Sequence, residues 1–334
     1  MSELEERLRT LVAGSIDGAE LDSLRPLQGG ASSLTLLATL RGDPARKVVV
    51  RQAPAGIMPL GARDVLRQAR IMQALQGCAG VAVPRVLFED PGDPPEVPPL
   101  FGMEFVDGES LEPHKDPIGQ GRSLPAPDAL AARALNAARM LAALHALPAE
   151  RIGIAAEPEL GPADELSRWS RVFATVDADM QPGAEAVAGL LNHRLPCAAP
   201  ACLVHGDFRL GNLLCRGTEP VAIVDWEIWS RGDPRFDLAW FLLTAEPQVH
   251  PLAIRDAPGM PRPDVLLATY QAASVRGVES LEWFRAAALY KMAASVSLIV
   301  KHSRRRGDPD GRAAALAPRV ATMLDRARTA LRDI

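Results

Sequence analysis

The chain has 334 residues, of which 48% are hydrophobic, 23% charged and 4% aromatic. This apolar fraction is enough for a packed core and excludes a disordered chain, and the length favours two domains or one unit with two lobes. The net charge of −4 and the few aromatic residues argue against a general nucleic-acid or membrane-surface binder. The charge is uneven: residues 1–235 carry 23 Lys and Arg against 31 Asp and Glu, whereas residues 236–334 carry 14 against 10.

The front of the chain is predicted to contain five strands, with one helix inserted after the third. A short amphipathic helix at residues 2–13 comes first, and apolar residues at helical spacing predict the inserted helix at Ala62–Leu75. Turn residues and a proline-rich loop separate the strand-like runs. These runs are residues 25–28, 33–40, 47–51, 85–89 and 100–106.

Alanine-rich helices dominate the rest of the chain, after a proline- and glycine-rich boundary at residues 112–127. Asp128 is the expected N-cap of the first helix. The predicted helices are 128–147, 163–179, 184–194, 236–244, 263–275, 280–303 and 312–332, and a short β region interrupts them at 201–224. This order predicts an α+β fold with two lobes.

The features that report on location indicate a soluble, cytoplasmic protein. The first residues are acidic where a signal peptide needs a basic region and an apolar run. The most apolar stretch, Ala286–Val300, carries Lys291 and is shorter than the roughly 18 residues of a membrane span. The cysteines show no metal-ligand spacing, so reduced thiols are the simplest interpretation.

The stretch between residues 203 and 227 carries the most informative pattern. Asp207 and Asn212 are five residues apart in a loop between two apolar runs, and Asp225 ends the second run. A turn at 216–220 folds this run back, so we expect Asp225 to come close to Asn212. The alternative is a helix cap with surface acids, which is the weaker one because carboxylates at buried strand ends are costly without a cation.

These residue types suit phosphoryl transfer. Carboxylate and amide oxygens are ligands that Mg²⁺ prefers, and a second carboxylate can orient and deprotonate a hydroxyl. The pattern of His205, Gly206, Asp207 and Asn212, followed by Asp225, Trp226 and Glu227, resembles the aminoglycoside phosphotransferase and choline kinase family. The run 203–240 is most similar to the phosphotransferase-like domains associated with acyl-CoA dehydrogenases.

This resemblance implies a bilobal protein-kinase-like fold. Its N-lobe, residues 1–106, would hold a five-stranded antiparallel sheet and one helix, and its C-lobe, residues 107–334, would be mainly helical. It also implies that Asp207 is the catalytic base and that Asn212 and Asp225 are Mg²⁺ ligands. Glu227 is expected to help hold a metal ion or its water.

Three further residues of the second lobe acquire expected roles from the resemblance. His205 is expected to brace the catalytic loop through hydrogen bonds, and Arg209 to neutralise Asp207 or meet the phosphate. Asp237 is expected to bind backbone N–H groups of the catalytic loop.

The resemblance places ATP on the first lobe. Gly29, Gly30 and Ser32 match the loop that covers the phosphates, where glycines let backbone N–H groups approach the phosphate. Glu104 and Val106 match the hinge, where the carbonyl of Glu104 and the N–H of Val106 would bind adenine. By themselves these are an ordinary turn and an ordinary strand end, and only the order of the elements gives them a function.

Two positions depart from the family pattern. Arg51 stands on the third strand where the family has a phosphate-binding lysine, and an arginine can also contact phosphates. Gln68 stands where the following helix carries an acidic partner for that residue, with Asp64 one turn earlier as a substitute. The alternative for Arg51 is a solvated strand residue.

The charge of the tail bears on the acceptor. A polycationic acceptor needs carboxylates in its binding site. Residues 236–334 are instead net positive and carry the basic cluster 301–306. We therefore expect an anionic or apolar acceptor of the hydroxy acid or hydroxyacyl-CoA type. A cationic helix end that the macrodipole favours explains the same cluster without a ligand. Two other hypotheses stay open, a nucleotide-binding pseudokinase with weak catalysis and an aminoglycoside kinase.

Overall fold

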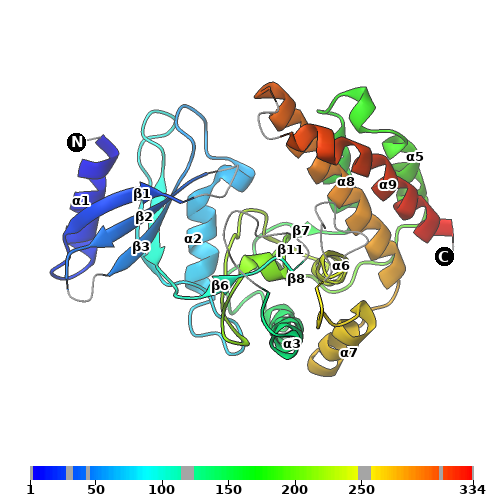
Figure 1. The fold of residues 1–334 in the computed structure, drawn as a ribbon, viewed down its shortest axis with the longest axis horizontal. Coiled ribbons are helices and arrows are strands. Elements are labelled where there is room, and N and C mark those ends of the chain that lie inside the picture. The colour runs from blue at the N-terminus through cyan, green and yellow to red at the C-terminus, as the bar shows by residue number, and fades with distance from the viewer. Residues whose placement is uncertain are drawn as a thin grey trace. The chain divides into compact units, whose positions relative to one another are not determined.

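The computed structural model describes residues 3–27, 33–42, 46–113, 124–246, 257–307 and 311–332. The chain forms two compact units. The first contains Met1–Glu109, Leu213–Arg216 and Pro220–Trp229, and the second contains Ser110–Asn212, Gly217–Glu219 and Ser230–Ile334. Strands dominate the first unit and helices the second (Figure 1).

The first unit is built on a five-stranded antiparallel sheet with the order β1-β2-β3-β5-β4, as the sequence predicts. Its strands are β1 (Leu21–Pro26), β2 (Leu34–Leu40), β3 (Lys47–Gln52), β4 (Val86–Asp90) and β5 (Leu100–Glu104). Helices α1 (Glu3–Ser15) and α2 (Val65–Ala74) lie on opposite sides of the sheet (Figure 1). Val48 and Val50 of β3 pack in one core cluster with α1. Because side chains alternate along a strand, Arg51 points to the other face.

A smaller sheet joins distant parts of the chain. It contains β6 (Glu109–Ser110), β9 (Leu213–Arg216) and β10 (Glu219–Ile223), in the order β10-β9-β6. The backbone N–H of Ile223 donates to the carbonyl of Ala82 at 2.8 Å, which ties the end of β10 to the first unit. Asp225 and Glu227, which follow β10, therefore belong to the first unit although they lie far beyond residue 106 in the sequence.

Helices form most of the second unit. They are α3 (Pro127–His145), α4 (Pro162–Phe173), α5 (Ala184–His193), α6 (Arg235–Thr244), α7 (Pro263–Ala273), α8 (Leu281–Arg305) and α9 (Arg312–Arg332). A sheet of three short strands, in the order β7-β11-β8, contains β7 (Glu159–Leu160), β8 (Cys202–Val204) and β11 (Ser230–Gly232). The segment that carries His205 and Asp207 follows β8.

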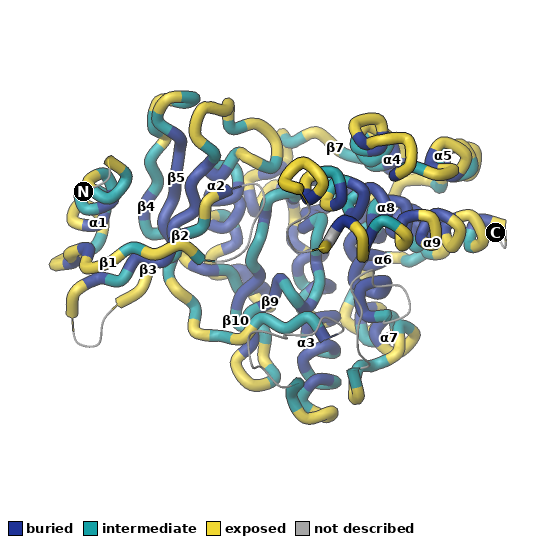
Figure 2. Tube along the Cα trace, turned by 45° about the horizontal axis from the view of Figure 1, so that its top comes forward, coloured by how far each residue is buried: buried dark blue, intermediate teal, exposed yellow. Residues whose placement is uncertain are grey.

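Helix α8 is the core of the second unit. It packs against α4, α5, α6 and α9, and Figure 2 shows most of its length buried. Within the described ranges, α8 is the one helix that is long and apolar enough to cross a membrane, and 72% of its most apolar window is buried inside the protein. Burial of this kind is typical of a core helix.

The start of α3 differs from the expectation. Asp128 is not the N-cap: Ala126 is, and Pro127 occupies the first turn together with Asp128. Proline favours this position because its fixed φ suits the helix and its missing N–H would be unpaired there anyway. The carboxylate of Asp128 instead lies in the first turn, where the helix dipole favours a negative charge.

Gly102 provides a test of the packing of the first sheet. It pairs with Phe88 across β4 and β5, and a Cβ added at Gly102 would lie 2.2 Å from the Phe88 ring. We expect Gly102→Ala to lower the free energy of unfolding by about 1–3 kcal/mol, because the ring must leave the core cluster. Urea unfolding measures the change. Gly14→Ala in α1 is the control: a Cβ there meets nothing within 4 Å, so stability should hold or rise, and an equal loss in both variants would contradict the account.

Candidate active site

A buried carboxylate holds the loop that carries Asp207. Asp237 of α6 accepts hydrogen bonds from the backbone N–H of His205 at 2.6 Å and of Gly206 at 2.8 Å. Gly206 has a φ of 85°, a conformation that favours glycine. The backbone N–H of Asp207 in turn donates to Nδ1 of the fully buried His205 at 3.1 Å. This hydrogen bond ties the side chain of His205 to the backbone of the loop.

Burial and hydrogen bonds oppose each other at Asp237. Burial raises its pKa, but the His145 hydrogen bond, the charges of His145 and His205 and the His205 backbone bond outweigh this effect, so the pKa lies below its ordinary value. His145 Nε2 is 3.5 Å from Asp237 Oδ2, and its Nδ1 lies 2.8 Å from the hydroxyl of Tyr270. Asp237 is therefore an ionised anchor for the loop.

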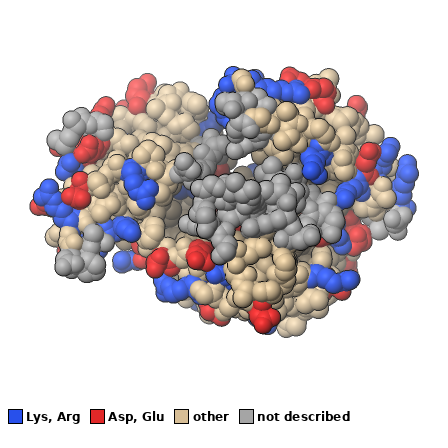
Figure 3. Space-filling view, viewed as in Figure 1, with Lys and Arg blue, Asp and Glu red and all other residues tan. Residues whose placement is uncertain are grey.

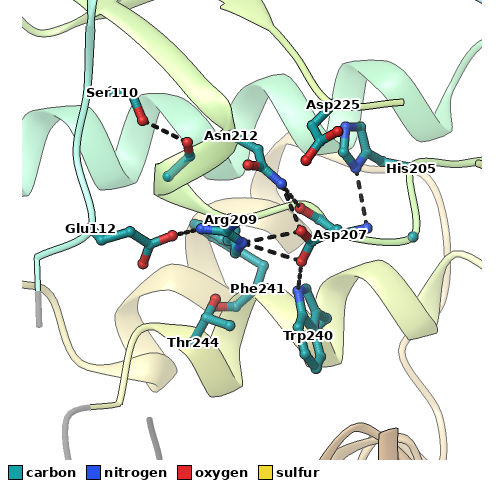
Figure 4. A network of polar contacts seen from close by, with 12 residues as sticks. Ser110, Glu112, His205, Asp207, Arg209, Asn212, Asp225, Trp240, Phe241 and Thr244 are labelled. Atoms are coloured by element: carbon teal, nitrogen blue, oxygen red, sulfur yellow. Dashed lines mark hydrogen bonds and ion pairs between the residues drawn. The ribbon is translucent and has the colours of Figure 1, made fainter. Parts of the chain in front are cut away.

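Several donors surround the carboxylate of Asp207 (Figure 4). The indole N–H of Trp240 donates to Oδ1 at 2.7 Å, and Nε of Arg209 lies 3.2 Å from both oxygens. Arg209 also forms an ion pair with Glu112. These contacts fix the orientation of the carboxylate, and the long contacts of Arg209 are the weakest of them.

Asn212 completes the surroundings of Asp207. Its side-chain nitrogen donates to the backbone carbonyl of Asp207 at 2.9 Å and to Oδ2 at 2.8 Å. Asn212 ends a short 3₁₀ turn (Leu210–Asn212) directly before β9 and is 4% exposed. Its amide oxygen has no hydrogen-bond donor among the described residues, because the nitrogen is the atom turned towards Asp207.

The acids predicted to hold a metal meet Arg51 within the first unit. Arg51 Nη1 lies 3.1 Å from Oδ1 of Asp225, and Nη2 forms an ion pair with Glu227. Ser33 Oγ accepts from Nη2 of Arg51 at 2.6 Å. Asp225 has a φ of 68°, which is uncommon for a residue other than glycine and is a form of strain that concentrates at functional sites. The counter-charge expected at these strand ends is supplied here by an arginine.

Arg51 does not pair with the residues expected on α2. The side chain of Gln68 donates to the carbonyl of Ala62 at 3.3 Å. Asp64 is the N-cap of α2, where it accepts from the backbone N–H of Arg67 at 2.9 Å. The alternative of a solvated Arg51 is also wrong, since the side chain is buried and has four donor contacts to three partners.

A clamp that the sequence analysis missed joins α2 to the segment after Glu227. The guanidinium of Arg67 lies 3.6 Å from the ring centroid of Trp229 and donates to the backbone carbonyl of Trp229 at 2.9 Å. The indole N–H of Trp229 donates back to the carbonyl of Arg67 at 3.3 Å. This reciprocal contact fixes the chain that carries Asp225 and Glu227 against α2.

The residues expected to bind the nucleotide are described only in part. Gly29, Gly30 and Ser32 lie outside the described residues. Glu104 ends β5, where its backbone N–H donates to the carbonyl of Arg85 at 2.9 Å. Val106 follows the strand, and its N–H has no hydrogen-bond acceptor within the described part of the chain.

The predicted metal ligands suit Mg²⁺ by their chemistry. Among the described residues, no group of three or more His, Cys, Asp or Glu side chains gathers as a metal centre. Asn212 instead offers an amide oxygen, and Asp225 a partly exposed carboxylate of which Oδ1 contacts Arg51. Oxygen atoms of this kind, completed by water and phosphate, are the ligands that Mg²⁺ prefers.

The basic cluster at the end of α8 belongs to the surface. Arg304 forms ion pairs with Asp179 at 2.7 Å and with Asp177 at 3.7 Å, and Lys301 donates to the carbonyl of Thr175. On the face drawn in Figure 3, basic and acidic side chains are interspersed. The interpretation of this cluster as a cationic helix end is therefore the better one.

Comparison with known sequences gives two findings. A model of the phosphotransferase enzyme family matches residues 23–266. Acyl-CoA dehydrogenase family member 10 of Mus musculus is 30% identical over 204 residues, which are 59% of this chain and 18% of that protein. The chain spans between 18% and 32% of the length of the curated relatives that it matches.

Comparison with solved structures shows the fold. A Ralstonia eutropha protein, provisionally assigned as an aminoglycoside phosphotransferase, is similar with a TM-score of 0.79 and 22% identity, covering 98% of each chain. The GDP and kanamycin complex of APH(2″)-IIIa is similar with a TM-score of 0.63 and 16% identity, covering 97% of this chain and 98% of the other. The predicted α+β, protein-kinase-like fold with two lobes is thereby confirmed.

Asp237 provides a test of the loop anchor. Asp237→Asn replaces one acceptor oxygen by an amide N–H group, which then faces a backbone N–H, so two donors meet. We therefore expect the free energy of unfolding to fall by about 2–4 kcal/mol at pH 7. The pKa of Asp237 is lower in the folded protein than in the unfolded chain. Its contribution to the free energy of unfolding is therefore complete above the unfolded pKa of about 4 and is lost as the pH falls below that value. The difference between wild type and variant should therefore shrink in acid. Asp264→Asn, on the exposed surface of α7, is the control, and a difference that is equal at pH 7 and pH 3 would contradict the account.

Proposed function

The chain belongs to the phosphotransferase enzyme family, and from that premise we propose that it is a kinase that transfers the γ-phosphoryl group of ATP to a hydroxyl of a small molecule. The observation that carries the proposal is the carboxylate of Asp207, oriented by Trp240 and Asn212 on a loop that Asp237 anchors. Phosphoryl transfer depends mainly on positioning and on charge. An oriented carboxylate of this kind supplies the positioning.

In the proposed reaction Asp207 binds the hydroxyl of the acceptor. The hydroxyl oxygen bonds to the γ-phosphorus, the bond from this phosphorus to the bridging oxygen breaks, and ADP leaves. The proton of the hydroxyl passes to Asp207. The long contacts of Arg209 to Asp207 are the ones that an incoming hydroxyl would replace.

The acids and arginines around ATP have separate proposed roles. Asn212, Asp225 and Glu227 would hold Mg²⁺, which neutralises phosphate charge when it is bound. Arg51, already held by Ser33, would exchange part of its contact with Asp225 and Glu227 for phosphate oxygens. His205 would hold the loop, and Arg209 would neutralise Asp207 or meet the phosphate.

The nucleotide is proposed to bind to the first unit. The N–H of Val106 and the carbonyl of Glu104 would bind adenine, and the loop with Gly29, Gly30 and Ser32 would cover the phosphates. The similar fold that binds GDP in APH(2″)-IIIa supports a nucleotide site. A kinase that uses cellular ATP is expected in the cytoplasm, the location that we propose.

We propose an anionic or apolar acceptor of the hydroxy acid or hydroxyacyl-CoA type. The relatives named as acyl-CoA dehydrogenases support an acyl compound, since the chain is similar to a segment of them. The kanamycin complex of APH(2″)-IIIa motivates the competing acceptor, an aminoglycoside. Both of these acceptors are small hydroxylated molecules.

One observation favours a second candidate function. Arg51 neutralises both Asp225 and Glu227, so a protein that binds ATP without transferring phosphate is the competing account. A panel of hydroxy acids, hydroxyacyl-CoA thioesters, amino alcohols, sugars and aminoglycosides separates the accounts in an assay of ATP consumption. The proposal expects turnover with the acids or thioesters. Thermal stabilisation by ATP and Mg²⁺ without any turnover supports the second account.

Asp207→Asn tests the role of the carboxylate. The amide keeps the shape of the side chain but cannot accept the proton, so we expect kcat to fall about 10²–10⁴-fold while ATP still stabilises the protein against heat. Steady-state kinetics on the best acceptor of the panel measures the change. Asp325→Asn, an exposed acid on α9, makes the same chemical change elsewhere and should leave kcat unchanged. Unchanged turnover in Asp207→Asn would contradict the assignment.

A further inference from the structure

Lys291 of α8 lies beside the catalytic loop, within the second unit. Its Nζ donates to the backbone carbonyl of Gly206, the residue directly before Asp207. The same ammonium lies 4.1 Å from the ring centroid of Trp240 and 5.5 Å from that of Trp169. Lys291, Trp240 and Trp169 form what we call the Lys291 cluster, which brings α4, α6 and α8 together at the loop.

The ammonium of Lys291 is a partly buried cation whose nearest acids lie beyond ion-pair distance. Among the described residues no carboxylate lies within ion-pair distance of it, and its one hydrogen bond goes to Gly206. An ammonium has three N–H donors, so two are left for another acceptor. Burial lowers the pKa of Lys291, while the negative charges of Asp207, Glu165 and Asp237 act in the opposite direction.

Two other cationic side chains of α8 pair with acids. Arg285 forms an ion pair with Glu246 at 2.7 Å, and Arg304 with Asp179 at 2.7 Å. Lys291 is held instead by one backbone carbonyl, two ring faces and the more distant charges of Asp207, Glu165 and Asp237. Unlike the surface cluster 301–306, it lies beside the loop that carries Asp207.

Trp240 connects this cation to the proposed base. Its indole N–H donates to Oδ1 of Asp207, whereas its ring face lies against Lys291. One rigid side chain therefore holds the carboxylate and the ammonium at a fixed separation. A ligand with a hydroxyl and an anionic group could meet both.

We propose that Lys291 is the residue that recognises the acceptor, by binding the carboxylate of a hydroxy acid whose hydroxyl is presented to Asp207. This inference rests on the proposed kinase function and names the substrate class of that site. The competing role for Lys291 is purely structural, in which its bond to Gly206 holds the loop and touches no ligand.

The test compares an acid with its neutral ester. Binding of 3-hydroxyoctanoate and of methyl 3-hydroxyoctanoate is measured by calorimetry with Mg²⁺ and the non-hydrolysable analogue AMP-PNP present. Lys291→Gln keeps a donor for the Gly206 carbonyl but removes the charge. We expect the Kd of the acid to rise about 10- to 100-fold and that of the ester to change less than about threefold. Lys301→Gln, also on α8 and also bonded to a backbone carbonyl, should change neither.

Two results overturn the inference. Equal weakening of acid and ester by Lys291→Gln shows a structural role, and no binding of the acid to the wild-type protein removes the proposed ligand. Neither result decides the kinase function, which the ATP-consumption panel tests separately with other acceptors.

A second measurement covers the case in which Lys291→Gln does not fold. In wild-type protein with ¹³C-labelled lysine, the acid should shift the ε-carbon resonance of Lys291 and the ester should not. Lys291→Arg, which retains the positive charge, identifies this resonance by its disappearance. A resonance that responds equally to both ligands, or to neither, overturns the inference.

Discussion

The carboxylate of Asp237 is the group on which the candidate active site depends. It is buried, it is ionised, and it binds the two backbone N–H groups that begin the catalytic loop. Hydrogen bonds to a charged group contribute about 1.5–3 kcal/mol each, which is enough to hold a loop in one conformation. Trp240, one turn further along α6, binds Asp207 itself. A single helix therefore positions both the loop and its functional carboxylate.

Local patterns in the sequence were sufficient for much of the fold. Alternation and turn residues predicted the five strands, and helical spacing predicted α2 and the helices of the second unit, because each of these signals lies within a few residues. The order of Asp207, Asn212 and Asp225 indicated the family, which the comparison shows. The roles of these residues stay predictions, as does the division of the chain at residue 106.

Contacts between distant residues could not be predicted in this way. Arg51 meets acids 174 and 176 residues further along the chain, so no local pattern near Arg51 or Gln68 records its partners. Lys291 meets Gly206 across 85 residues, and in the sequence it was only an interruption of an apolar stretch. The spacing of Asp237 and Trp240 was a usable signal, because residues three apart share one face of a helix.

The central claim is that this chain phosphorylates a hydroxyl group and that Asp207 takes the proton. The most direct measurement is ³¹P NMR of a reaction that contains the protein, Mg²⁺, ATP and the acceptor that drives the fastest ATP consumption in the panel. The account predicts a phosphate monoester resonance that grows as ADP forms and that is absent with Asp207→Asn. Inorganic phosphate as the sole new product, or a monoester formed equally well by Asp207→Asn, would contradict it.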